Sequence, residues 1–94
     1  MKIVLVCAAG ASTSLMMARM KKFAKEGDVI EAFPFSKLEE IIDGYDVVLV
    51  GPQLRYKLGE AQKISEGRGK KCGLIDSRDY GMMDGEKVYN FAVN

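Results

Sequence analysis

The sequence has no histidine, no tryptophan and only two cysteines among its 94 residues. The chain therefore cannot itself supply an imidazole base, a phosphohistidine or a histidine ligand for a metal. Structural zinc sites use four nitrogen or sulfur ligands, so two cysteines without histidine predict no metal site. Outside oxidising compartments, two cysteines are also more typical of free thiols than of a disulfide.

An excess of charge and a long apolar run are missing as well. Lys and Arg number 14 against 13 Asp and Glu, which leaves a net charge of +1 and no global field to attract nucleic acid. No apolar run approaches the roughly 20 residues that cross a bilayer, and the run at residues 1–6 is too short for a secretory signal. We therefore expect a cytoplasmic protein that binds no nucleic acid and does not insert into a membrane.

Short apolar segments alternate with segments of helical periodicity along the chain. The expected strands are Lys2–Val6, Val29–Phe33, Asp46–Val50 and Cys72–Ile75. Helices are expected from about Thr13 to a stop at Gly27, from an N-cap at Ser36 to Ile42, from Gln53 to about Ser65, and from a cap at Asp84 to Asn94. In the first helix, Met16, Met20, Phe23 and Ala24 share the apolar face. This alternation predicts a single α/β domain, residues 1–94, with a four-stranded parallel sheet.

Ligands of such sheets bind beyond the carboxyl ends of the strands, where the strand order reverses. The segments expected there are Cys7–Ser14, Phe33–Ser36, Gly51–Arg55 and Asp76–Gly81. Cys7 has the most chemical interest, because it lies between a buried strand and the start of a helix. A helix N-terminus lowers the pKa of a thiol, which favours the nucleophilic thiolate.

The residues that follow Cys7 are small or hydroxylated: Ala8, Ala9, Gly10, Ala11, Ser12, Thr13 and Ser14. Small residues let backbone N–H groups point inward as an anion-binding nest, and the hydroxyls add donors that suit phosphate oxygens. The alternative is a structural turn whose small residues let the helix pack on the sheet. Cys72 begins its strand at the opposite edge, so we expect an inert thiol that does not pair with Cys7.

Four ordered blocks of sequence carry a family resemblance. They are Cys7-x-x-Gly10-x-Ser12-Thr13-Ser14, Ile30–Pro34, Asp46–Gln53, and Ile75-Asp76-Ser77 with Tyr80-Gly81 and Asp84-Gly85. Together they resemble the enzyme IIB component of the lactose/cellobiose/chitobiose class of the bacterial phosphoenolpyruvate-dependent sugar phosphotransferase system. The resemblance covers nearly the whole chain, although the final helix looks shorter than is usual in that family.

The resemblance implies a three-layer αβα sandwich, similar to low-molecular-weight tyrosine phosphatases, and a phosphocysteine intermediate. By it, Cys7 accepts a phosphoryl group from a phosphohistidine on the IIA partner and passes it to a sugar of the cellobiose, chitobiose or lactose type at the membrane partner IIC. Ala8 to Ser14 then form the phosphate loop, and Gln53 and Tyr80, on loops at the same edge, are candidate rim residues. No cofactor is implied, and we expect a monomer.

Other functions stay open at this point. A flavodoxin-like module would hold the phosphate of FMN in the same loop, with Tyr56 and Tyr80 beside the flavin. A small cysteine-dependent phosphatase or arsenate reductase is opposed by Thr13, which stands where such enzymes have an arginine, six residues after the cysteine.

The roles of some charged residues also stay open. Asp76 or Asp79 is a candidate general acid, with a strand-end cap or a solvated turn as the alternative. The sugar and the role of the basic cluster Arg19, Lys21, Lys22 and Lys25 are not predicted.

Overall fold

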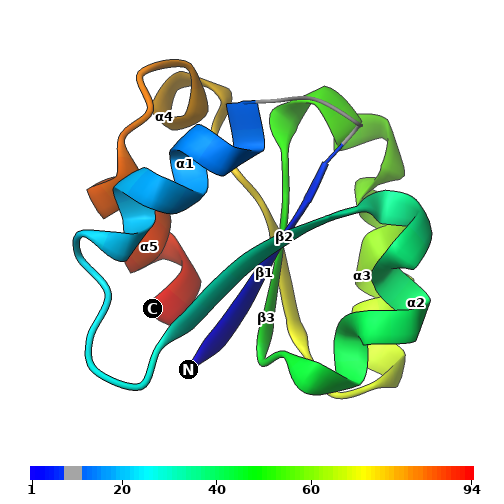
Figure 1. The fold of residues 1–94 in the computed structure, drawn as a ribbon. Helices are drawn as coiled ribbons and strands as arrows, with labels where there is room; N and C mark the ends of the chain where they lie inside the picture. Colours follow the sequence, from blue (N-terminus) through cyan, green and yellow to red (C-terminus); the bar gives the residue numbers. More distant parts are fainter. Residues whose placement is uncertain (8–11) are drawn as a thin grey trace.

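The computed structural model describes residues 1–7 and 12–94 (Figure 1). Four parallel strands form one sheet in the order β2-β1-β3-β4. Their bounds are Lys2–Cys7 for β1, Val29–Pro34 for β2, Val47–Val50 for β3 and Lys71–Leu74 for β4. The predicted α/β fold with a four-stranded parallel sheet is confirmed.

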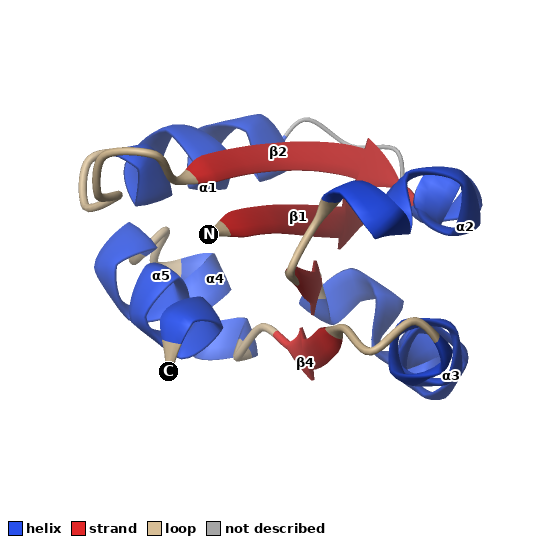
Figure 2. Cartoon of the chain, turned by 90° about the horizontal axis from the view of Figure 1, so that it is seen from below, coloured by secondary structure: helices blue, strands red, loops and turns tan. Residues whose placement is uncertain are grey.

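Helices cover both faces of this sheet (Figure 2). The α-helices are α1 at Ser12–Lys21, α2 at Leu38–Ile41, α3 at Leu58–Gly67, α4 at Ser77–Gly81 and α5 at Gly85–Val93. Three 3-10 helices lie between them, η1 at Phe35–Lys37, η2 at Ile42–Gly44 and η3 at Pro52–Lys57. Helices α1, α4 and α5 lie on one face, and α2 and α3 lie on the other. The expected three-layer sandwich is therefore present.

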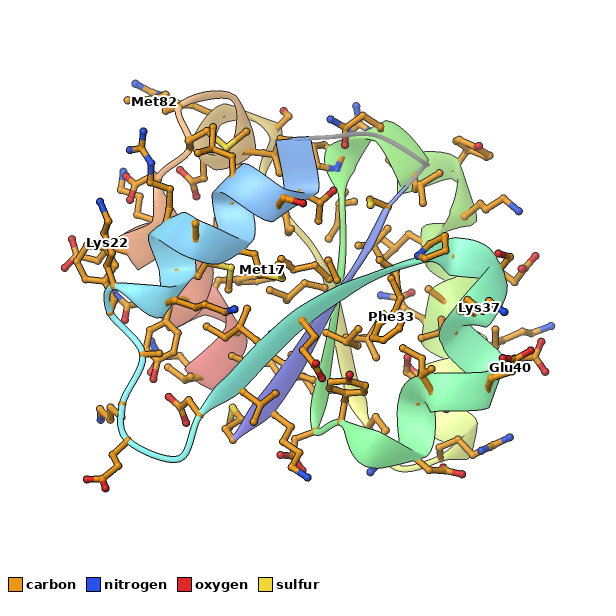
Figure 3. The ribbon with its side chains drawn as sticks, in the orientation of Figure 1. Met17, Lys22, Phe33, Lys37, Glu40 and Met82 are labelled. Carbon is orange, nitrogen blue, oxygen red and sulfur yellow. The ribbon has the colours of Figure 1, made fainter. Side chains whose placement is uncertain are left out.

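The strands are continuous apolar runs because both of their faces are buried. Ile3 and Leu5 of β1 face the cluster under α1, α4 and α5, whereas Val4 and Val6 face the cluster under α2 and α3. Met17 packs against the first cluster and Phe33 against the second (Figure 3). All four residues from Ile3 to Val6 are 0 or 1% exposed, so β1 is the centre of the protein.

Several local predictions were wrong, each for a physical reason. Helix α1 ends at Lys21, and Phe23 beyond it is 45% exposed, although Met16 and Met20 are fully buried as expected. Ser36 is not an N-cap, because Pro34 is the extended residue before η1 and Ser36 lies inside that turn. The helix expected from Gln53 is a 3-10 helix with non-helical angles at Leu54, and α3 begins only at Leu58.

The segment after β4 contains a helix that the sequence did not predict. Asp76 accepts hydrogen bonds at Oδ1 from the N–H groups of Arg78 (2.8 Å) and Asp79 (3.2 Å), and so caps α4. The predicted cap of the last helix is confirmed, because Asp84 accepts at Oδ1 from the N–H of Lys87 at 3.1 Å. Among the described residues, no helix is both long and apolar enough to cross a membrane.

Asp28, in the loop before β2, ties α5 to the amino edge of the sheet. Its carboxylate accepts hydrogen bonds from the Tyr89 hydroxyl, from the amino group of Met1 (2.9 Å) and from the N–H of Lys25 (3.0 Å). These bonds, of which that from Tyr89 has the largest effect, hold the pKa of the Asp28 carboxyl well below its usual range.

This contact predicts a specific sensitivity to acid. A carboxyl group with a lowered pKa stabilises the fold above the pKa of the unfolded chain, about 4, and the contribution is lost as the pH falls below that value. Asp28→Asn should therefore lower the melting temperature at neutral pH and flatten its decline below about pH 4. Tyr89→Phe, which keeps the carboxylate, should have a smaller effect. An acid decline in Asp28→Asn as steep as in the parent protein would contradict this.

Candidate active site

Cys7 is the last residue of β1 and lies where the strand order reverses. The chain passes from β1 to β2 on one side and then returns to place β3 on the other side of β1. Cys7 is therefore at the switch point, the position where sheets of this type bind ligands. Its side chain is half-buried and its thiol is free. The predicted location of Cys7 at the carboxyl edge is confirmed.

Helix α1 starts at the same edge at which β1 ends (Figure 1). Its first turn holds Thr13, which is 5% exposed, and Ser14, which is exposed. No acidic side chain occupies that turn, so the positive end of the helix dipole is not neutralised there. The predicted loop residues Ala8, Ala9, Gly10 and Ala11 lie outside the described residues, as does the side chain of Ser12.

Gly51 joins the end of β3 to the site. Its N–H donates to the carbonyl oxygen of Val6 at 3.0 Å, which continues the β1–β3 pairing by one residue. A Cβ placed on Gly51 would lie 3.8 Å from the Cβ of Cys7 and 3.1 Å from the Oε1 of Gln53. The exposed Gln53 side chain therefore folds back over Gly51, and the structure places Gln53 and Cys7 near the same point. The sequence signal for Gly51 was a Gly-Pro pair directly after a buried strand.

Tyr80 occupies a different position from the one predicted. It lies in α4 rather than on a loop, and it is only 5% exposed within the cluster under α1, α4 and α5. The placement of Tyr80 on an exposed rim loop was wrong, because the segment after Asp76 winds into a helix that turns this ring inward. Asp76 holds the cap position of α4, which agrees with the structural alternative for that residue.

Tyr80 and Tyr56 also do not form an aromatic sandwich. Tyr80 is a core residue, whereas Tyr56 in η3 is 75% exposed. A flavin at this edge would need ring faces that open towards the ligand, so the two tyrosines give no support to the FMN module.

The second cysteine has a contrasting environment. Cys72 lies in β4, pairs in register with Val48, and has a free thiol like that of Cys7. Burial raises the pKa of the Cys72 thiol, and a hydrogen bond with Ser65 offsets this only in part. A raised pKa lowers the thiolate population, and with it the reactivity. The prediction that the two cysteines do not form a disulfide is confirmed.

Comparisons with known proteins agree on one family. The family model described as "PTS system, Lactose/Cellobiose specific IIB subunit" matches residues 2–91. The chain is 38% identical over 96 residues to the oligo-beta-mannoside-specific EIIB component of Bacillus subtilis (strain 168), with 99% of this chain and 93% of that protein covered. It is 41% identical over 100 residues to the galactose-specific EIIB component of Lactococcus lactis subsp. cremoris (strain MG1363), with 98% and 93% covered.

Solved structures give the same answer. The cellobiose-specific IIB component of Borrelia burgdorferi has a TM-score of 0.81 at 41% identity, with 100% of this chain and 89% of that chain covered. The lactose-specific IIB component domain of Streptococcus pneumoniae has a TM-score of 0.84, with 97% and 92% covered; its 16% identity makes it a likeness of fold alone. Neither the flavin-binding module nor the phosphatase is favoured by these likenesses. The chain belongs to the lactose/cellobiose-specific IIB subunit family of the phosphotransferase system.

Proposed function

We propose that Cys7 is the phosphoryl carrier of this IIB component and that phosphocysteine is its intermediate. The observation that carries the proposal is the position of the Cys7 thiol, half-buried at the switch point between β1 and β3 and at the edge where α1 begins. The positive end of the α1 dipole lies at this same edge, where it favours the negative charge of phosphoryl oxygens. Cys72, inside β4 and with a raised pKa, lacks this setting.

The proposed reaction has two displacement steps at phosphorus. The Cys7 thiolate attacks the phosphohistidine of a IIA partner; the S–P bond forms as the P–N bond breaks, and the imidazole keeps the electron pair. A hydroxyl oxygen of a sugar held by IIC then attacks the same phosphorus. The O–P bond forms, the S–P bond breaks and the thiolate is regenerated, while the hydroxyl proton passes to the acceptor site or to solvent.

Residues Ala8 to Ser14 are proposed to hold the phosphoryl oxygens, and Gln53 to lie at the rim. Phosphoryl transfer depends mainly on positioning and on electrostatic stabilisation, which backbone N–H groups supply. Thr13 provides no positive charge and the chain has no histidine base, so hydrolysis should be slow. A carrier benefits from this, because its phosphorylated form must survive until the acceptor is reached.

The proposed setting is the cytoplasm, with IIA as donor and with IIC at the inner face of the membrane as acceptor. Residues 1–94 would act as one domain and as a monomer. Relatives at about 40% identity are named for oligo-beta-mannosides, galactose and cellobiose, so identity at this level does not select one sugar. Lys22 of the basic cluster and Met82 point outward (Figure 3), where a partner could reach them.

A phosphotransfer assay tests the proposal directly. Incubation with phosphoenolpyruvate, the general phosphotransferase proteins and a IIA component should add one phosphoryl group to the chain, and peptide mass mapping should find it on Cys7. Membranes that contain IIC should discharge it when cellobiose, chitobiose or lactose is added, and the sugar that discharges it fastest is the substrate. A label on any other residue, or no label, would refute the carrier role of Cys7.

A further inference from the structure

Gly51 has an ordinary backbone conformation, so the glycine is not required by the backbone. Its φ of −65° and ψ of 148° are extended angles that any residue adopts. The absence of a Cβ matters for space instead. A Cβ at Gly51 would lie 3.1 Å from Gln53 Oε1 and 3.8 Å from Cys7 Cβ, so both atoms lie close to the same point. Glycine at this position therefore leaves free a space that the Gln53 carboxamide and the Cys7 side chain both border.

The backbone around Gly51 holds the two side chains in this relation. The N–H of Gly51 donates to Val6 O at 3.0 Å, and its carbonyl oxygen accepts from the N–H of Leu54 at 2.9 Å. The first bond connects the start of η3 to β1, immediately before Cys7. The second closes the turn that carries Gln53. Because Leu54 is 3% exposed in the core, this turn is anchored on both sides.

We propose that the side-chain carboxamide of Gln53 binds the phosphoryl group carried by Cys7, and that Gly51 makes room for this contact. The inference rests on the proposed function, since it needs a phosphoryl group on Cys7. That group is joined to the Cys7 Cβ through only two bonds, Cβ–Sγ and Sγ–P, so it is confined to the region that the Gln53 carboxamide also borders. A carboxamide has two N–H donors on one end, and a half-turn about its last bond presents them where Oε1 now lies.

The chemistry of a neutral donor suits a carrier. A hydrogen bond to the charged oxygens is stronger than one between neutral groups. It therefore holds the phosphoryl group in position for the attacking nucleophile and the leaving group. A carboxamide brings no full positive charge and no acid or base, unlike the arginine and acid of a phosphatase. Gln53 therefore binds the group without promoting attack by water.

Substitutions at Gln53 should change the transfer rate in a graded way. A hydrogen bond to a charged group corresponds to about tenfold in rate or more. Gln53→Ala should slow transfer from phosphorylated IIA to Cys7 about tenfold, and Gln53→Glu, which places a carboxylate against the phosphoryl oxygens, about a hundredfold. Gln62→Glu makes the same charge change in the middle of α3 and should transfer at the parent rate. Melting temperatures of all variants identify any loss of folding.

Gly51→Ala tests the proposed role of the glycine. The exposed Gln53 side chain can move away from a new methyl group, so the variant should fold. The same movement displaces the Gln53 carboxamide from its position near Cys7. Transfer should slow by about the same tenfold as in Gln53→Ala. Adding Gly51→Ala to Gln53→Ala should then cost little more, because both act on one contact. If the double variant transferred a further tenfold more slowly than Gln53→Ala, Gly51 and Gln53 would not act on one contact, and the proposed role of Gly51 would be overturned.

A measurement without any partner separates phosphoryl binding from docking. In the isolated phosphorylated protein, the ³¹P resonance of phosphocysteine should titrate at a higher pH in Gln53→Glu than in the parent chain, because a nearby like charge disfavours the dianion. Gln62→Glu should leave it unchanged. If Cys7 is labelled but the Gln53 variants keep the parent rate and ³¹P titration, or only raise the KM for IIA, this inference is overturned. If the parent chain is not labelled at Cys7, the proposed function itself fails.

Discussion

Replacing Cys7 by serine should reduce phosphoryl transfer by roughly a thousandfold or more, the scale observed when an enzyme loses its nucleophile. Serine keeps the size and shape of the side chain, but its hydroxyl does not ionise near neutral pH. The chain has no histidine to act as a base for it. Because Cys7 is only half-buried, stability should change by less than about 1 kcal/mol. The measurement is the label incorporated from phosphoenolpyruvate through IIA, together with thermal melting.

Cys72→Ser is the matched control for this experiment. Cys72 is the other free cysteine of the chain, and it lies in β4, where burial raises the pKa of its thiol. Its replacement should leave transfer at the parent level. Retention of the label in Cys7→Ser, or its loss in a folded Cys72→Ser, would contradict the assignment.

Gly85→Ala should destabilise the fold by about 3 kcal/mol, towards the upper end for overpacking a core. Gly85 begins α5 where that helix meets α1. A Cβ there would lie 2.4 Å from the carbonyl carbon of Arg19 and 2.6 Å from its carbonyl oxygen. These are backbone atoms, so no side-chain rotation relieves the overlap, and α1 and α5 must separate. Chemical denaturation measures the loss as a lower midpoint.

The same change should weaken phosphoryl transfer, because α1 begins at the carboxyl edge of the sheet, where β1 ends (Figure 1). Gly59→Ala is the control: among the described residues, nothing lies within 4 Å of a Cβ on Gly59 in α3. Alanine favours a helix over glycine by up to about 1 kcal/mol, so this variant should be as stable as the parent or more so. Equal stability of Gly85→Ala and the parent chain would contradict this, because it would show that α1 and α5 can move apart without a loss of stability.

The errors in the sequence-based prediction share a physical cause. Helix α4 has five residues, too few to show helical periodicity, and the capping bonds of Asp76 and the packing of Tyr80 define it instead. Phe23 fits the apolar period of α1 but follows the end of that helix at Lys21, so its ring is left exposed. The local apolar pattern of the sequence does not predict the last residue of a helix when tertiary contacts determine where the helix ends.

The sequence by itself determined the buried strands, since a strand covered on both faces must be apolar along its length, as in Val47–Val50. It also determined that a cysteine ends the first strand just before a helix. Only the tertiary structure decided which strands are neighbours. The order β2-β1-β3-β4 brings the turn after β3 against the end of β1, and so sets Gly51 and Gln53 beside Cys7, more than forty positions away along the chain. Any two strands can form the same backbone hydrogen bonds, so the packing of side chains from the whole chain makes that choice, and no local pattern in the sequence records it.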